Sequence, residues 1–236
     1  MDSNKKNIFY EQILQKVSRK DHKIGIIGMG YVGLPLALAF CKKDITTLGF
    51  DINKNIINSL KNCISYINHI QSSEIKKYVN NNKLIPSENL ENINNVDVII
   101  ICVPTPLNKN KEPDLTFIKN SLDSIKNFLH KGQILILEST TYPGTTEEIL
   151  KPFIEREGLE IGKDFFLVYS PEREDPGNKI YKTHNIPKII GGCTKNCASI
   201  AKNIYSQITD EIIVLSSTRA AEMTKLVENI HRAVNI

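Results

Sequence analysis

Short apolar runs alternate with amphipathic segments along most of the chain. The runs are rich in Ile, Val and Leu and are bounded by Gly, Pro or polar residues, which is typical of strands buried on both faces. They predict strands at residues 23–28, 45–51, 97–104, 133–140, 164–173 (where the strand enters a loop), 186–192 and 210–217. The segments between them carry apolar residues at helical spacing. They predict helices at residues 31–43, 53–62, 114–132, 145–158, 194–208 and 218–236.

The regular alternation predicts one α/β domain with additions at both ends. Residues 1–22 have apolar side chains at helical spacing and predict a short amphipathic helix on the domain edge. Residues 23–216 predict a doubly wound, Rossmann-like parallel sheet, interrupted by a polar, partly helical excursion at residues 63–95. Residues 217–236 begin a long helix that has no C-terminal stop signal.

Several predicted helices have recognisable end signals. Asn53 is a plausible N-cap of the helix that follows it. Asp114 is expected to cap the start of the helix at residues 114–132, and Gly132 is expected to end it. Thr145, followed three residues later by Glu148, has the pattern of a capping box.

The first predicted strand runs into the stretch GMGYVG, in which Gly28, Gly30 and Gly33 have the spacing G-x-G-x-x-G. This spacing is a weak signal alone, but here a strand precedes it, a helix follows it, and Asp51 ends the next strand. Gly28 allows the tight turn, Gly30 lets a pyrophosphate approach the backbone, and Gly33 lets the helix pack on the strand. A carboxylate at Asp51 accepts hydrogen bonds from ribose hydroxyls and repels a 2′-phosphate. NAD is therefore predicted over NADP, a preference that the nearby Lys54 weakens slightly.

Composition narrows the possible functions. The chain has a formal net charge of +4 without a dense Lys/Arg block, so a nucleic-acid partner is not expected. Its five cysteines include no C-x-x-C spacing, so no metal site is expected and the thiols are predicted to be free and reduced. No segment reaches the ~20 apolar residues of a transmembrane helix. The polar N-terminus lacks the apolar run of a signal peptide, so we expect a cytoplasmic protein with no membrane partner.

Five motifs follow one another along the chain: GMGYVGLPLALAF, VPTPLN, ESTTYPGTTEE, YSPEREDPGN and AAEMTKLVENIHRAVNI. Together they resemble the UDP-glucose/GDP-mannose dehydrogenase family, and within it the bacterial branch that acts on UDP-N-acetylglucosamine for O-antigen and capsule synthesis. The similarity runs from about Lys23 to Ile236. It implies an enzyme that uses NAD to oxidise the C6 alcohol of a UDP-N-acetylhexosamine to the uronic acid.

The resemblance also implies roles for residues at the ends of the predicted strands and on the last helix. The implied cofactor contacts are Gly28, Met29, Gly30, Tyr31, Val32, Gly33, Asp51, Val103, Thr105, Ser139 and Thr140. The implied catalytic residues are Thr140, Glu172, Lys225 and Asn229. The implied substrate site holds Glu172, Arg173, Lys225, Asn229 and Arg232.

The chemistry of these residue types suits the implied roles. Glu172 follows a predicted strand, where a carboxylate can transfer protons or order the hydrolytic water. Lys225 and Asn229 lie four residues apart, so they share one face of the helix and can both donate to a developing oxyanion. Spacing alone leaves alternatives open for each of these residues. Glu172 could be a surface glutamate paired with Arg173, and Thr140 could cap the next helix. Lys225 and Asn229 could belong to a solvent-facing polar stripe.

The sequence departs from the family pattern in two respects. Pro176 stands where animal-type UDP-glucose dehydrogenases carry a second glutamate, which favours the N-acetyl-sugar branch. The family's nucleophilic cysteine and its UDP-binding C-terminal domain follow the central helix, beyond Ile236. We therefore expect that the chain binds NAD but cannot complete the oxidation alone.

The last helix also predicts a homodimer, because the family dimerises through it and its apolar face is expected to be exposed. That face consists of Met223, Leu226, Val227, Ile230 and Val234. Three other functions stay open. They are a catalytically incomplete NAD-binding or assembly module, a dehydrogenase of UDP-N-acetylmannosamine or UDP-glucose, and a dehydrogenase of the hydroxyacid type.

Overall fold

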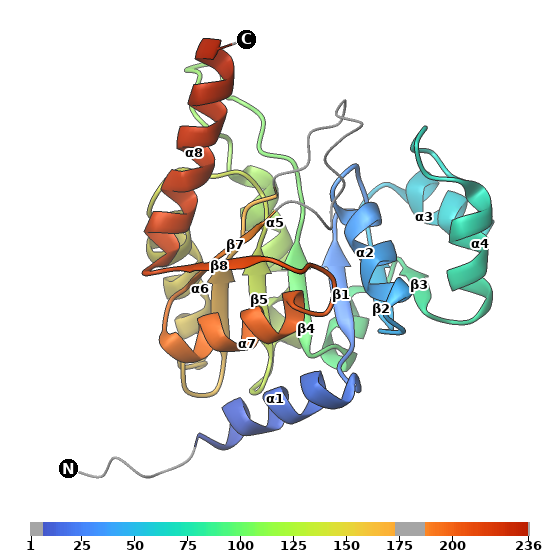
Figure 1. Ribbon diagram of the computed structural model, residues 1–236, viewed down its shortest axis with the longest axis horizontal. Coiled ribbons are helices and arrows are strands. Elements are labelled where there is room, and N and C mark those ends of the chain that lie inside the picture. The colour runs from blue at the N-terminus through green and yellow to red at the C-terminus, as the bar shows by residue number, and fades with distance from the viewer. Residues whose placement is uncertain (1–6, 173–186, 236) are drawn as a thin grey trace.

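The computed structural model describes residues 7–172 and 187–235. Among these residues, eight strands form one sheet in the order β3-β2-β1-β4-β5-β6-β7-β8 (Figure 1). The strands are β1 Ile24–Ile27, β2 Thr47–Phe50, β3 Leu84–Ser87, β4 Val98–Ile101, β5 Ile134–Leu137, β6 Phe166–Tyr169, β7 Lys188–Gly192 and β8 Ile212–Leu215. The helices are α1 Ile8–Arg19, α2 Gly33–Lys42, α3 Lys54–Lys61, α4 Ser72–Asn80, α5 Thr116–Ile125, α6 Lys151–Arg156, α7 Lys195–Tyr205 and α8 Thr218–Asn235.

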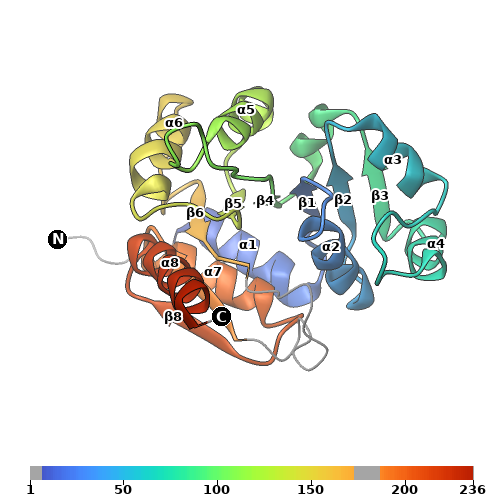
Figure 2. The ribbon, with the colours of Figure 1, turned by 90° about the horizontal axis from the view of Figure 1, so that it is seen from above.

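Helices cover both faces of the sheet (Figure 2). On one face α1, α2 and α7 share a core with Ile26 and Ile136, and on the other α5 and α6 share a core with Ile99 and Leu135. Successive side chains of a strand point to opposite faces, so a strand covered on both sides has to be apolar throughout. β1, β4, β5 and β6 are buried along their whole length. This layering confirms the predicted doubly wound, Rossmann-like α/β fold.

The sheet is mixed, whereas the sequence predicts a parallel one. The strands from β3 to β6 in the sheet order run parallel. β7 pairs antiparallel with β6, with Tyr169 opposite Gly191, and β8 runs parallel to β7. The apolar pattern of a buried strand does not encode its direction, so this reversal could not be predicted. It places Lys188, the first residue of β7, at the edge where the parallel strands end.

Residues 63–95 contain a strand as well as the expected helical structure. α4 lies in this segment, and β3 follows it and pairs with β2 at the edge of the sheet. Pro86 lies within β3, which is tolerated because an edge strand has one side without ladder hydrogen bonds. A short strand with exposed positions and a proline does not stand out in the sequence pattern.

The predicted capping box at Thr145 and Glu148 is wrong. The Thr145 hydroxyl donates to the backbone C=O of Tyr142 at 2.8 Å. The Glu148 carboxylate turns outward and accepts from Arg219 at 2.6 Å. The segment begins instead with a π-helical turn at Thr146–Leu150, which leads into α6.

The two terminal helices lie at opposite ends of the sheet (Figure 1). α1 buries Ile13 and Val17, and its Tyr10 hydroxyl lies 2.9 Å from the hydroxyl of Ser199 on α7. α8 buries Ala221 near its start and then rises beyond the sheet. In the part of the chain that the structure describes, no helix is long and apolar enough to cross a membrane.

The turn from β1 into α2 depends on the absence of a side chain at Gly33. A Cβ built on Gly33 would lie 1.9 Å from the backbone oxygen of Gly28, whereas one built on Gly30 meets no atom within 4 Å. We expect G33A to lower the free energy of unfolding by about 3 kcal/mol, because the turn has to shift. Urea unfolding measures this loss, with G30A as the matched control that unfolds like the wild type. Equal losses in the two variants would contradict the expectation.

Candidate active site

Six parallel strands end at the same edge of the sheet, and five of them bring residues of the predicted site or its neighbours together there. The residues that follow them are Gly28 after β1, Asp51 after β2, Cys102 after β4, Glu138 after β5 and Glu172 three positions beyond β6. Ligands of open α/β sheets bind outside this edge. Those predicted site residues that the structure describes therefore lie near the carboxyl ends of the strands.

The glycine turn is tied to the end of β2 and leaves open space at its centre. Gly28 has a φ of +96°, and a Cβ there would lie 2.6 Å from a backbone oxygen at the end of β4, whereas Gly30 faces open space. The Met29 N–H donates to Asp51 Oδ2 at 2.8 Å, and the Asn53 N–H donates to Oδ1 at 2.8 Å. Leu34 and Leu36 in the first turn of α2 donate back to Gly30 and Val32 at 3.1 and 3.2 Å, so the N–H groups that can meet an anion are those of the turn before them. This arrangement fits the pyrophosphate and the ribose of a dinucleotide.

Three side chains flank the glycine turn. Tyr31 lies at its tip and is 65% exposed, and Val32 is half-buried at the start of α2. The Tyr66 hydroxyl donates to the backbone C=O of Met29 at 2.5 Å. Tyr66 was not predicted as a site residue, because it comes from the polar segment 63–95 and has no motif around it.

Ser139 joins the loops that follow β4 and β5. Its hydroxyl donates to the backbone C=O of Val103 at 2.7 Å. Thr140, the next residue, is exposed, and Thr105 is half-buried in the loop after β4. The structure thus brings these predicted cofactor residues to one edge, where Ser139 acts on the backbone of the neighbouring loop.

A buried ion cluster lies where β5 and β6 end and β7 begins. It is formed by Glu138, Glu172, Lys188 and Tyr205. The Lys188 ammonium lies 2.9 Å from Glu138 Oε2 and 3.5 Å from Glu172 Oε2. The Tyr205 hydroxyl donates to Glu138 Oε1, and Lys188 Nζ lies 4.8 Å from the centre of the Tyr205 ring. The side chain of Glu138 is 0% exposed and that of Lys188 is 11% exposed. Charges this deeply buried require such partners.

The cluster holds two carboxylates against one ammonium. Burial raises the pKa of Glu138 to about 7; Lys188 opposes this rise and Glu172 adds to it. Although burial disfavours the ammonium, the two carboxylates raise the pKa of Lys188 above its usual value. Glu138 therefore changes its charge near neutral pH while Lys188 stays protonated.

Glu138 and Lys188 were not predicted as site residues. The stretch ILILE carried a usable signal, since a charged residue directly after an unbroken apolar strand is placed where burial is expected. The partner of that charge could not be predicted, because the direction of β7 decides which end of the strand Lys188 occupies.

α8 brings Lys225 to Glu172. The Lys225 ammonium donates to the backbone C=O of Glu172 at 2.5 Å. Asn229 lies one turn further along the same helix face and is half-buried, whereas Arg232 is exposed. Arg173 lies outside the described residues. Two of the predicted catalytic residues, far apart in sequence, are therefore in direct contact.

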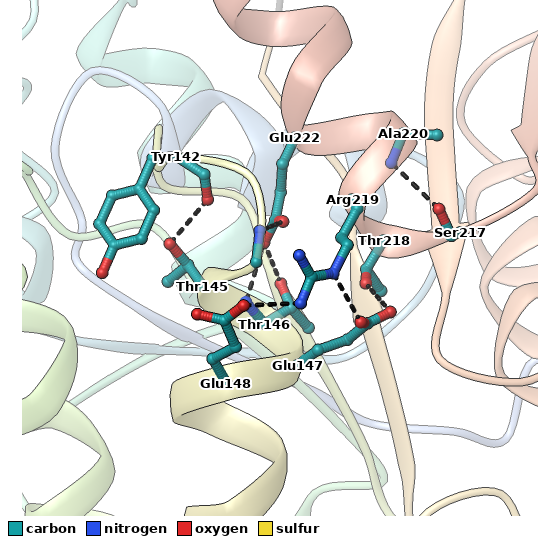
Figure 3. Close-up of polar contacts among 11 residues, drawn as sticks. Tyr142, Thr145, Thr146, Glu147, Glu148, Ser217, Thr218, Arg219, Ala220 and Glu222 are labelled. Atoms are coloured by element: carbon teal, nitrogen blue, oxygen red, sulfur yellow. Dashed lines mark hydrogen bonds and ion pairs between the residues drawn. The ribbon is translucent and has the colours of Figure 1, made fainter.

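A second buried carboxylate fixes the start of α8 (Figure 3). Glu222 is 0% exposed and accepts from the Gly144 N–H at 2.6 Å, the Thr146 N–H at 2.9 Å and the Thr146 hydroxyl at 2.6 Å. These N–H groups open the helical segment 146–156, so the Glu222 carboxylate caps it from another element. Because Gly144 follows Thr140 closely and Lys225 follows Glu222 by one turn, this contact ties the two parts of the predicted site together.

Three of the five cysteines do not have the environment of a reactive nucleophile. Burial raises the pKa of Cys41 to about 12 and also raises the pKa of Cys102 and Cys193. A reactive thiol needs a lowered pKa instead. Within residues 7–172 and 187–235, no group of three or more His, Cys, Asp or Glu side chains is arranged to hold a metal ion.

The open glycine turn, the carboxylate after β2 and the loops at the common edge define a dinucleotide-binding α/β protein. Residues 22–209 match the NAD binding domain of the UDP-glucose/GDP-mannose dehydrogenase family. The chain belongs to this family, which confirms the resemblance carried by the five sequence motifs and the prediction of NAD as cofactor.

Individual relatives differ in the sugar that their names specify. The chain is 41% identical over 219 residues to a UDP-N-acetyl-D-glucosamine 6-dehydrogenase of Pseudomonas aeruginosa, covering 92% of this chain and 51% of that protein. It is 36% identical over 228 residues to a UDP-N-acetyl-D-mannosamine dehydrogenase of Campylobacter jejuni, covering 91% and 54%. The structure of the UDP-N-acetyl-mannosamine dehydrogenase Cap5O from Staphylococcus aureus matches with a TM-score of 0.83 at 40% identity, covering 91% and 52%. The chain thus spans about half the length of these relatives.

The anchor at the start of α8 can be tested by replacing Glu222 with Gln. Gln keeps the shape of the side chain, but it has one acceptor oxygen instead of two, and its amide would face an N–H donor. We expect E222Q to lower the free energy of unfolding by about 2 kcal/mol in urea titrations.

The matched control is R219A, which removes the ion pairs of Arg219 with Glu147 and Glu148 next to the anchor. The Arg219 side chain is 51% exposed, so we expect a much smaller loss. A loss in R219A as large as that in E222Q would contradict the role of the buried carboxylate.

Proposed function

We propose that the protein carrying this chain oxidises the C6 alcohol of a UDP-N-acetylhexosamine to the uronic acid with NAD+, for surface polysaccharide synthesis. The observation that carries the proposal is the contact of Lys225 with Glu172 at the same sheet edge as the open turn at Gly30. Family membership and the names of the relatives support it. We further propose that residues 23–216 form the NAD-binding domain, between the N-terminal helix (1–22) and the start of the central helix (217–236).

The strand ends supply the cofactor contacts. When bound, NAD+ would accept the hydride in each of the two oxidation steps that lead from the alcohol to the acid. The N–H groups of residues 30–33 bind its pyrophosphate, and Asp51 binds its adenosine ribose. Val103, Thr105, Ser139 and Thr140 line the side of the nicotinamide. The Asp51 carboxylate repels a 2′-phosphate, so NAD+ is preferred over NADP+.

Glu172, Lys225 and Asn229 surround the reacting oxygen in this proposal. The Lys225 ammonium and the Asn229 amide stabilise negative charge that develops on the C6 oxygen when the alcohol loses its proton. Glu172 accepts that proton. It would also order the water that hydrolyses the thioester between C6 and the family's nucleophilic cysteine, which releases the acid and the thiol. Thr140 contacts this water from the loop after β5.

For the sugar we favour UDP-N-acetylglucosamine. Pro176 in place of a second glutamate and the name of the Pseudomonas aeruginosa relative support this choice. The names of the mannosamine-specific relatives support UDP-N-acetylmannosamine as the alternative. Arg173 and Arg232 complete the substrate side in either case. We also propose a cytoplasmic location, in keeping with the free cysteines.

We propose a homodimer that forms through the outer face of α8. The apolar side chains of this face are exposed: Met223 by 46%, Leu226 by 38%, Val227 by 55%, Ile230 by 53% and Val234 by 78%. Grouped apolar exposure of this kind marks an interaction surface. A second copy of the same helix would cover it.

Binding of NAD+ to the glycine turn is tested with G30A. The added methyl group fills the open space at Gly30 without meeting protein atoms, so the variant should fold normally and still exclude the pyrophosphate. We expect an affinity for NAD+ lower by about 10-fold in titration calorimetry. Equal affinities of wild type and G30A would contradict the proposed cofactor site.

The reaction is tested on the full-length protein that contains this chain. We expect NADH to form with UDP-N-acetylglucosamine faster than with UDP-N-acetylmannosamine or UDP-glucose. K225A should lower kcat about 100-fold and change KM much less, because the ammonium acts on charge that develops during the reaction. Formation of no NADH from any of these UDP-sugars would overturn the proposed function.

A further inference from the structure

Glu172 lies outside the sheet, three positions beyond the last residue of β6. A carboxylate that transfers protons has to be held in a fixed geometry. Two lysines contact Glu172 in different ways. Lys225 donates to its backbone C=O at 2.5 Å, whereas the Lys188 ammonium lies 3.5 Å from its carboxylate. Of these two contacts, the second is the one made with the carboxylate of the side chain.

Lys188 is itself fixed by the sheet and by two partners. It is the first residue of β7, so its backbone belongs to the sheet. Its ammonium lies 2.9 Å from the fully buried Glu138 carboxylate and 4.8 Å from the centre of the Tyr205 ring. A buried ammonium held by a carboxylate and an aromatic face has little freedom to move. Lys188 can therefore transmit the rigidity of the sheet to the loop after β6.

We propose that Lys188 is a positioning residue for Glu172, which holds the carboxylate at the sheet edge and favours its ionised form, and that Glu138 fixes the Lys188 ammonium in place. The inference rests on the proposed function, because it takes Glu172 as the residue that transfers protons. It assigns to Lys188 and Glu138 no contact with substrate or cofactor. They act through Glu172.

Of the two residues, only Lys188 is charged in the acidic range in which a carboxyl beside an ammonium titrates, because burial raises the pKa of Glu138 to about 7. An opposite charge nearby lowers the pKa of a carboxyl. Removing the Lys188 ammonium should therefore raise the pKa of Glu172, and replacing Glu138 with Gln should leave it nearly unchanged. Further titratable groups face the cluster from neighbouring elements: Cys102 after β4, Tyr169 on β6 and Lys225 on α8.

The test is a carbon-13 titration of the glutamate carboxyl groups in the intact protein, with the Glu172 signal assigned through E172Q. In K188M we expect the titration of Glu172 to move up by about one pH unit or more. In E138Q we expect it to stay near the wild type, because Glu138 is already protonated in this pH range, and in K188R to stay near the wild type, because Arg keeps the cation. A purely structural role would not raise the titration in K188M and leave it unchanged in K188R. No upward shift in K188M, or an equal upward shift in E138Q, would overturn the inference.

Two further variants make the comparison secure. K188M leaves Glu138 buried without its cation, which can prevent folding. The double variant K188M/E138Q avoids this, because neither side chain is charged. The pKa of Glu172 should be higher in this double variant than in E138Q. An equal pKa in the two would overturn the inference. The control K163M breaks an exposed lysine pair, with Glu160 at 2.7 Å, before β6 at the opposite end of the strands, and should leave Glu172 unchanged.

Turnover of the full-length protein separates this inference from the proposed function. If the wild type oxidises UDP-sugars, the acid limb of its kcat/KM profile should move with the Glu172 titration in each variant. If the wild type oxidises UDP-sugars but the acid limb does not move in the variants, the role of Lys188 is overturned and the proposed function stands. If the wild type oxidises no UDP-sugar, the proposed function falls, and the carbon-13 titration still decides whether Lys188 controls the charge of Glu172.

Discussion

The parallel pairing of the strands fixes where the residues that follow β1, β2, β4, β5 and β6 lie. Ile27 at the end of β1 pairs with Phe50 of β2 and with Ile101 of β4, so the segments that follow these strands start from one line. The backbone groups of buried apolar strands are satisfied only by this pairing. A slip of one residue would turn each strand's side chains to the opposite face. The site at the strand ends is thus a consequence of the register of the sheet, to which the glycine turn adds the anion-binding backbone.

Two buried carboxylates then attach the remaining parts to this edge, and each is satisfied by a different chemistry. Glu138 is paired with the ammonium of Lys188, and its burial, which this pairing only partly offsets, raises its pKa to about 7. Glu222 is held by backbone and hydroxyl donors at the start of a helical segment. The first arrangement controls charge beside Glu172, and the second places α8 and Lys225. Function here depends on polar contacts inside an otherwise apolar framework.

Much of this could be predicted from the sequence, because local patterns determine it. Unbroken apolar runs predicted all but one strand, and the glycine spacing with Asp51 predicted the turn that the structure shows. The direction of β7, the strand at Pro86 and the contacts of Glu138, Lys188 and Tyr66 could not be predicted. They arise where segments far apart in sequence meet, and neither periodicity nor residue type encodes such meetings. The capping box was wrongly predicted for the same reason, because Glu148 accepts a hydrogen bond from Arg219, which lies far away in the sequence.

The central claim is that the cofactor bound at the glycine turn and the residues on α8 serve one reaction at the strand ends. A crystal structure of the protein grown with NAD+ tests this claim most directly. The account predicts the pyrophosphate against the backbone of residues 30–33, the adenosine ribose at Asp51, and the nicotinamide at the ends of β4 and β5, on the side of Glu172. A dinucleotide bound away from the glycine turn, or with its nicotinamide directed away from Glu172 and Lys225, would contradict the account.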